Sequence, residues 1–216
     1  DHSFARPYDN TFSDGMVRVC TEFFTKSGFT PLLAYTFSDE ISLLFPELPF
    51  DGRIEKLASV CASFASSSLT IALRLDDPVA FDARIIPVES GHVSGYLAWR
   101  QKEAWRNHMN GYSQTVLVRQ GMKPHLVQRQ LDGLKAAELH EICFQNGINL
   151  ATTPSWERRG IMVYKKQAQK EGMNPVTGEK TLAIRHIVVE DRDLPLFSGP
   201  QGQEMIMSLI SRSDAC

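Results

Sequence analysis

The chain has 216 residues, enough to bury a large hydrophobic core without disulfide bonds. Its formal net charge of −2 gives no overall attraction for nucleic acid, so any such binding must come from a local cluster of basic residues. The four cysteines are far apart and form no C-x-x-C pair, which excludes the usual ligand pattern of a structural zinc site. No apolar run approaches membrane-spanning length, and we expect neither a signal peptide nor a membrane partner. These features predict a cytoplasmic protein.

The first predicted elements are a helix and a hairpin. An amphipathic helix is expected from Pro7 to Lys26, with apolar side chains at three- and four-residue spacing and Gly28 as its stop. Two β-prone runs follow, from Pro31 to Phe37 and from Ile41 to Phe45, and apolar residues alternate along the second. A polar break separates them, so we predict a hairpin that turns at Ser38-Asp39-Glu40.

The predicted turn holds two adjacent carboxylates, Asp39 and Glu40. Two such groups at a rigid corner repel each other, and desolvation increases the cost. A divalent cation is the simplest compensation, because oxygen ligands suit Mg²⁺. An acidic turn exposed to water is the alternative, and it requires no ion.

A second helix is predicted to begin near Asp51. Small residues dominate its apolar face, so we expect it to pack closely on a sheet. Arg53 and Lys56 lie one turn apart near its first turn, and with the positive end of the helix dipole they would form a polyphosphate site. A solvated basic edge, paired with Glu55, is the alternative for these two residues.

The segment from Val79 to Val88 is interpreted as a further strand. The order is then helix, strand, strand, helix, strand, and a strand placed before Asp1 would complete a βαββαβ arrangement. The predicted fold class is therefore α+β, an antiparallel sheet with helices on one face. We expect residues 1–93 to form this first region and residues 94–216 to form a second one.

The second region is predicted to contain helices followed by a β-ribbon. The expected helices are Ser94 to Arg119, Pro124 to Leu131 and Ala136 to Gln145. Strands at Ile161 to Lys165 and Thr181 to Glu190 would form a projecting ribbon.

Basic residues gather around the first ribbon strand: Arg158, Arg159, Lys165 and Lys166. Such local concentration in an acidic protein is the expected footprint of contact with RNA phosphates. The alternative is that these residues only make an exposed ribbon soluble.

Seven short motifs, in this order, resemble those of the tRNA-histidine guanylyltransferase family: Phe4-Ala5-Arg6-Pro7-Tyr8-Asp9, Ser38-Asp39-Glu40, Arg53-Ile54-Glu55-Lys56, Phe81-Asp82-Ala83-Arg84, Trp99-Arg100-Gln101, Gly147-Ile148-Asn149 and Arg158-Arg159-Gly160. The likeness is strongest to the archaeal-type, guanylyltransferase-like members. It implies a palm domain similar to that of ordinary polymerases. It also implies nucleotide addition to the 5′ end of tRNA in the 3′-to-5′ direction, with ATP or GTP as substrates and two Mg²⁺ ions at the reacting oxygens. A homotetramer built as a dimer of dimers is implied as well.

The resemblance assigns roles to individual residues. Asp39 corresponds to a metal-bridging carboxylate and Glu40 to its essential acidic neighbour, so both are expected to be catalytic and to serve the metal site. The residues implied to surround the incoming nucleotide are Ala5, Asp9, Ser38, Arg53 and Lys56. The residues predicted to contact tRNA are Arg106, Asn107, Arg158, Arg159, Lys165 and Lys166.

Two departures from the family pattern bear on function. The family's first metal carboxylate lies in an Asp-Gly-Arg motif that would precede Asp1. Eukaryotic-type members carry His-Ile-Asn-Asn where this chain has Trp105-Arg106-Asn107-His108, and its absence points to template-dependent repair of tRNA 5′ ends. The alternatives are guanosine addition specific to tRNA-histidine, a palm-type nucleotide cyclase and an inactive tRNA-binding module.

Overall fold

The computed structural model describes residues 4–173 and 180–211, with side chains described for 4–169 and 184–211. Its longer helices and strands, in chain order, are α1 (Asn10–Thr25), β1 (Leu33–Phe37), β2 (Glu40–Leu44), α2 (Ile54–Leu73), α3 (Val93–Arg119), α4 (Pro124–Leu131), α5 (Ala136–Gln145), α6 (Ser155–Arg159), β3 (Ile161–Met173), β4 (Lys180–Asp191) and α7 (Pro200–Ser211). The first helix, the hairpin, the long helix and the ribbon all occur where the sequence predicts them.

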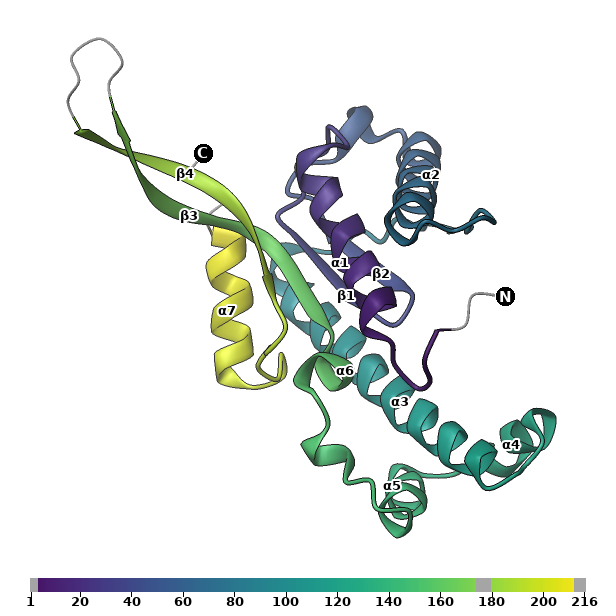
Figure 1. The fold of residues 1–216 in the computed structure, drawn as a ribbon. Helices are drawn as coiled ribbons and strands as arrows, with labels where there is room; N and C mark the ends of the chain where they lie inside the picture. Colours follow the sequence, from purple (N-terminus) through teal and green to yellow (C-terminus); the bar gives the residue numbers. More distant parts are fainter. Residues whose placement is uncertain (1–3, 174–179, 212–216) are drawn as a thin grey trace.

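The strands form one antiparallel sheet in the order β2-β1-β3-β4. Within the hairpin Phe37 pairs with Glu40, and on the other side of β1 Thr36 pairs with Ile161 of β3. Beyond β1 the paired strands β3 and β4 continue alone as a ribbon that projects from the body of the molecule (Figure 1). The α+β fold with an antiparallel sheet is confirmed. The strand β3, however, which pairs with β1 on the side away from β2, comes from the second predicted region.

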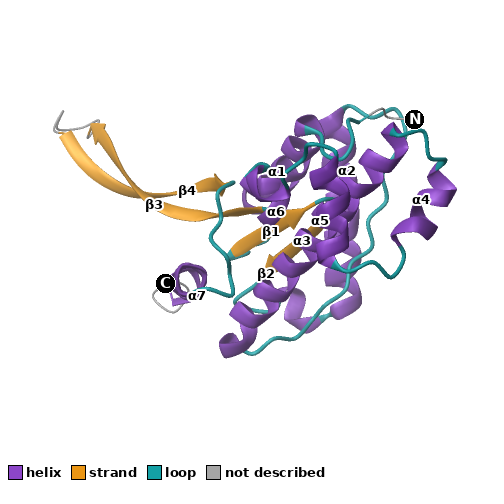
Figure 2. Ribbon diagram, turned by 90° about the horizontal axis from the view of Figure 1, so that it is seen from below, coloured by secondary structure: helices purple, strands orange, loops and turns teal. Residues whose placement is uncertain are grey.

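Helices cover both faces of the sheet, which corrects the expectation of helices on one face (Figure 2). Every residue of β1 is buried, and successive side chains alternate between the two sides. Ala34 packs with Val17 and Cys20 of α1. Leu33, Tyr35 and Phe37 instead pack with residues of α3 and α7. The hairpin is therefore fixed between two helical layers.

The strand predicted at Val79–Val88 is wrong, because this segment runs without strand pairing in the structure. Prolines at both ends of the segment limit its ability to donate strand hydrogen bonds. Side chains of α2 hold it instead: the Val79 amide donates to Thr70 Oγ1 at 3.3 Å and the Phe81 amide to Ser66 Oγ at 3.0 Å. Small polar residues of α2 therefore hold an extended segment against the helix.

The helix α2 packs against α1, where a side chain on Gly15 would meet Leu73. It is long and apolar enough to cross a membrane by length and composition alone. This corrects the expectation that no run approaches that length. One such helix is weak evidence for a membrane span, because core helices of soluble proteins pass the same test.

Candidate nucleotide-binding site

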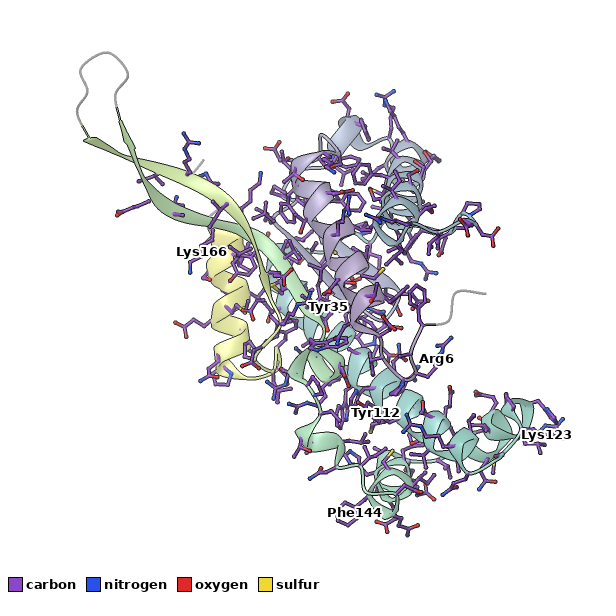
Figure 3. All side chains as sticks on the ribbon, viewed as in Figure 1. Arg6, Tyr35, Tyr112, Lys123, Phe144 and Lys166 are labelled. Carbon is purple, nitrogen blue, oxygen red and sulfur yellow. The ribbon has the colours of Figure 1, made fainter. Side chains whose placement is uncertain are left out.

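A pocket of about 350 Å³ lies where the N-terminal segment, the hairpin and the middle of α3 meet. Its size falls in the range of small-molecule sites. The predicted site residues that line it are Ala5, Asp9, Ser38, Asp39 and Asn107. These residues come from three separate parts of the chain, so the fold brings together residues that the sequence places far apart. Arg6 also lines the pocket and is exposed, in the segment before α1 (Figure 3).

Asp9 shapes one wall of this pocket. Its Oδ1 accepts a hydrogen bond from the Phe12 amide at 3.1 Å and caps α1, while Oδ2 accepts from the Ala5 amide at 2.8 Å. These backbone hydrogen bonds favour the charged carboxylate and lower the pKa of Asp9. The carboxylate therefore folds the segment from Ala5 to Asp9 back onto the start of the helix.

The hairpin turn forms the opposite wall. Ser38 adopts a positive φ of 50°, which lets the chain reverse between β1 and β2. Thr36 Oγ1 donates to the Glu40 carbonyl at 2.7 Å and ties the two strands together just behind the turn. Asp39 is exposed at the corner and lines the pocket.

Glu40 lies apart from Asp39. It is the strand partner of Phe37, so its side chain projects to the sheet face that α3 covers, and it does not line the pocket. Its Oε2 forms an ion pair with Nη2 of Arg100 on α3. The two adjacent carboxylates of the turn are thus directed to different surroundings.

The residues around the pocket fit Mg²⁺ only in part. Asp39 offers the carboxylate oxygens that this ion prefers. Among the described residues, however, no group of three or more Asp, Glu, His or Cys side chains comes together. The hairpin therefore presents one carboxylate to the pocket, and an ion bound there would need its remaining ligands from other groups, such as phosphate oxygens.

Two family models together match most of the chain. The family model described as tRNAHis guanylyltransferase matches residues 1–89, and the model of the Thg1 C terminal domain matches residues 91–193. The chain belongs to the tRNA-histidine guanylyltransferase (Thg1) family. It is accordingly a guanylyltransferase-like nucleotidyltransferase that acts on tRNA. A search of curated proteins finds no match.

Solved structures of Thg1-like proteins share the fold. A bacterial tRNA(His) guanylyltransferase (Thg1)-like protein in complex with ATP has a TM-score of 0.68 and 24% identity, covering 96% of this chain and 82% of its own. A bacterial Thg1-like protein in complex with GTP has a TM-score of 0.64 and 24% identity, with coverages of 96% and 81%. The tRNA(His) guanylyltransferase of Saccharomyces cerevisiae has a TM-score of 0.64 and 23% identity, with coverages of 84% and 80%.

The two cations that the Thg1 resemblance assigns to the triphosphate lie outside the pocket. Lys56 Nζ sits 4.4 Å from the centre of the Phe50 ring, and Arg53 Nε donates to the Phe50 carbonyl at 3.2 Å. Both side chains belong to exposed residues at the start of α2. Their role toward the triphosphate remains a prediction, and these side-chain contacts are with Phe50 in the turn before α2.

Several residues predicted to bind tRNA have other surroundings in the structure. Asn107 lines the pocket, whereas its neighbour Arg106 is exposed and pairs with Glu103 at 2.9 Å. Arg159 Nη1 donates to the Leu194 carbonyl at 2.7 Å, and Arg158 has a buried Nε without a hydrogen-bond partner among the described residues. The guanidinium of Arg159 is therefore already engaged within the protein, and the Nε of Arg158 is buried away from any RNA.

Lys165 and Lys166 are both exposed on β3, at the base of the ribbon (Figure 3). Adjacent residues of a strand point to opposite faces. The two ammonium groups therefore serve different faces of the ribbon, so a single RNA strand lying on one face would reach only one of them.

Sequence reasoning missed a buried polar cluster behind the pocket. Tyr112 Oη donates to Glu157 Oε2 at 2.6 Å, and Tyr8 packs against His108 and Trp156 with ring centres 5.6 Å apart in each case. Burial lowers the pKa of His108 to about 4 and raises the pKa values of Tyr112 and Glu157. Because Tyr8 and Trp156 also line the pocket, this cluster supports the wall opposite the hairpin.

Proposed function

We propose that this Thg1 family member adds nucleotides to the 5′ end of tRNA in the 3′-to-5′ direction, in template-dependent repair of tRNA 5′ ends. The observation that carries the proposal is the pocket that joins Ala5, Asp9, Ser38 and Asp39 to Asn107. Two family motifs and the polar side of α3 converge there. The bacterial Thg1-like neighbours in complex with ATP and GTP support a nucleotide as its ligand.

In the proposed reaction the 5′ end of the tRNA is first activated, either by adenylylation or by an existing triphosphate. The 3′-hydroxyl of the incoming nucleotide then attacks the 5′ phosphorus. A new phosphodiester bond forms as the hydroxyl loses its proton to a base or to water, and AMP or pyrophosphate leaves with the electron pair of the broken phosphoanhydride bond.

The residues of this chain would divide the work between binding and orientation. Asp39 would hold a metal ligand position beside the pocket, while Ser38 within the pocket and Arg53 and Lys56 outside it would contact the triphosphate. Two Mg²⁺ ions, when bound, supply charge stabilisation to the attacking and leaving oxygens. Glu40 as a direct metal ligand stays a prediction, and its pairing with Arg100 favours an indirect role.

Labelled GTP and a tRNA shortened at its 5′ end provide the main test. We expect labelled nucleotide to be added opposite the template residues of the acceptor stem. Formation of a cyclic nucleotide from GTP without RNA would support the cyclase instead. Absence of Mg²⁺-dependent triphosphate binding in calorimetry would support an inactive tRNA-binding module.

The range of tRNAs that the protein extends distinguishes general 5′-end repair from guanosine addition specific to tRNA-histidine. A shortened tRNA other than tRNA-histidine should be extended about as well as tRNA-histidine if the repair proposal is right. Extension confined to tRNA-histidine would favour guanosine addition. The motivation for general repair is the sequence Trp105-Arg106-Asn107-His108, which lacks the His-Ile-Asn-Asn motif.

We further propose that the protein works in the cytoplasm as a homotetramer. The described cysteines Cys20, Cys61 and Cys143 are free thiols, which suits a reducing compartment. The tetramer follows from the family resemblance, and light scattering coupled to size exclusion would measure it.

A further inference from the structure

The Trp99-Arg100-Gln101 segment of α3 holds the hairpin that carries Asp39. Arg100 forms its ion pair with Glu40, sixty positions earlier in the chain. The next residue, Gln101, donates to the Pro195 carbonyl at 3.1 Å and accepts from the Phe197 amide at 2.8 Å. Adjacent residues of one helical turn thus connect the hairpin and the segment before α7.

The guanidinium of Arg100 is confined on several sides. Its central carbon lies 4.7 Å from the centre of the Trp99 ring and 5.2 Å from that of Phe37, distances at which a cation is attracted to an aromatic face. Its side chain is only 12% exposed. Phe37 is also the strand partner of Glu40, so aromatic and acidic contacts fix the same end of the hairpin.

A second contact extends this attachment along β2. Ser42 follows Glu40 by two residues and therefore lies on the same face, where its Oγ is 3.4 Å from Tyr96 Oη. Tyr96 in turn packs against Trp99, with ring centres 5.8 Å apart. The helix therefore contacts the strand at two successive positions on one side.

Thr36, in the other strand of the hairpin, fixes the backbone of Glu40, because its hydroxyl donates to the Glu40 carbonyl. The residue after Asp39 is thus fixed at both its side chain and its main chain. Asp39 itself is left to project into the pocket beside Ser38.

We propose that Arg100 is a positioning residue that aims the Asp39 carboxylate at the nucleotide pocket by anchoring Glu40 to α3. This inference rests on the proposed function, because it concerns the same site. Glu40 then acts indirectly, since its carboxylate anchors the turn while Asp39 alone is presented to a divalent cation and the triphosphate.

Positioning by Arg100 and simple competition by Arg100 predict opposite changes in Mg²⁺-dependent triphosphate binding when Arg100 is removed. If Arg100 only competed with a divalent cation for the carboxylates, its removal would strengthen Mg²⁺-dependent binding of a triphosphate. If Arg100 orients Asp39, its removal weakens that binding, because outer contacts of a metal ligand typically contribute about 10- to 100-fold.

A double-mutant cycle in the full chain tests the proposal. Calorimetry would measure Mg²⁺-dependent binding of a non-hydrolysable GTP analogue to the wild type, Arg100→Met, Glu40→Gln and the double variant. We expect each single variant to bind about 10-fold or more weakly. The double variant should be no weaker than the worse single one, because both changes break one ion pair. Arg100→Lys, which keeps the charge but not the planar fork, should recover part of the loss.

A matched control separates positioning from general stability. Arg192 pairs with Asp14 at 2.6 Å, neither residue lines the pocket, and the Arg192 side chain is 30% exposed. Arg192→Met should lower the unfolding temperature without changing analogue binding, and thermal unfolding of every variant would ensure that all are folded during the assay.

Three outcomes would overturn the positioning role: tighter binding by Arg100→Met, unchanged binding, or losses that multiply in the double variant. Multiplying losses would mean that Glu40 acts on the metal by itself. A wild type without Mg²⁺-dependent binding would overturn both proposals. A wild type that binds the analogue but does not extend tRNA would overturn the proposed function alone, and the cycle would still decide the role of Arg100.

Discussion

Gly160, at the junction of α6 and β3, permits the close approach of β3 to the hairpin. Its φ is 77° and its ψ is −170°, a conformation that is nearly restricted to glycine. A Cβ at this position would lie 2.7 Å from both the Thr36 carbonyl oxygen and the ring of the buried Tyr35. Neither neighbour can move easily, because Thr36 belongs to the sheet and Tyr35 donates to the Arg159 carbonyl at 2.7 Å.

The cost of Gly160→Ala combines two effects. The unfavourable backbone conformation accounts for about 1 to 3 kcal/mol of lost stability. The steric overlap adds about 1 to 3 kcal/mol, the usual cost of overpacking a core. The total is about 2 to 6 kcal/mol, which for a chain of this size lowers the unfolding temperature by about 4 to 24 °C.

Gly147→Ala provides a control that is matched in φ. Its φ of 78° is nearly the same, but no atom lies within 4 Å of the added Cβ. Urea titrations of both variants, followed by circular dichroism, would give the two free energies of unfolding. We expect Gly160→Ala to be less stable than Gly147→Ala by at least about 1 kcal/mol. Equal losses would refute the argument from close packing at the β1–β3 junction.

Four further predictions concern the site and its surroundings. Asp39→Asn should reduce nucleotide addition about 10³-fold, equivalent to about 4 kcal/mol, at saturating Mg²⁺. Lys56→Ala should raise the nucleotide KM more than it weakens tRNA binding, because a cation is removed from the phosphates. Neutralising Lys165 and Lys166 together should reduce the salt dependence of tRNA binding by about 1 unit of slope, because an RNA strand on one face of the ribbon reaches only one of them. Burial lowers the pKa of His108 from 6.5 to about 4, so on acidification the unfolded chain binds a proton at higher pH than the folded chain does. The free energy of unfolding should therefore fall by about 3 kcal/mol as the pH drops from above 6.5 to 4, which urea titrations at several pH values would measure.

Each of these predictions has a result that would contradict it. Near-normal turnover of Asp39→Asn would remove Asp39 from the metal site. Equal small changes in KM and tRNA affinity would make Lys56 a solvated edge residue. Parallel salt-dependence lines would show that the ribbon lysines do not contact tRNA. For His108, a His108→Gln variant with the same acid sensitivity as the wild type would assign that sensitivity to other groups.

Local signals in the sequence predicted most of the helices and both hairpins. Periodic apolar residues and clear stops mark α1, α3, α4 and α5, while the acidic turn between apolar runs marks β1 and β2. The helix α7 was not predicted, although Pro200 at its start and apolar residues at three- and four-residue spacing were available signals.

The errors arose where tertiary contacts decide the local structure. The segment at Val79–Val88 is rich in β-prone residues, but hydroxyl groups of α2 satisfy its amides in place of a neighbouring strand. The different directions of Asp39 and Glu40 could not be read from their adjacency, since they depend on the strand pairing of Glu40 with Phe37 and on Arg100. The family motifs identified the residues, and the fold determined which of them meet.

The pairing of β1 with β3 means that the two matched halves of this protein do not form independent units. Residues 33–36 of the first half pair with residues 161–164 of the second, and buried side chains of both halves fill the same core. Residues 1–89 expressed alone would leave the β1 edge exposed, a surface prone to intermolecular association. Chimaeras that exchange the C-terminal half between relatives would therefore need β1 and β3 residues that fit each other. For the same reason, the two halves of this chain are expected to have changed together during evolution.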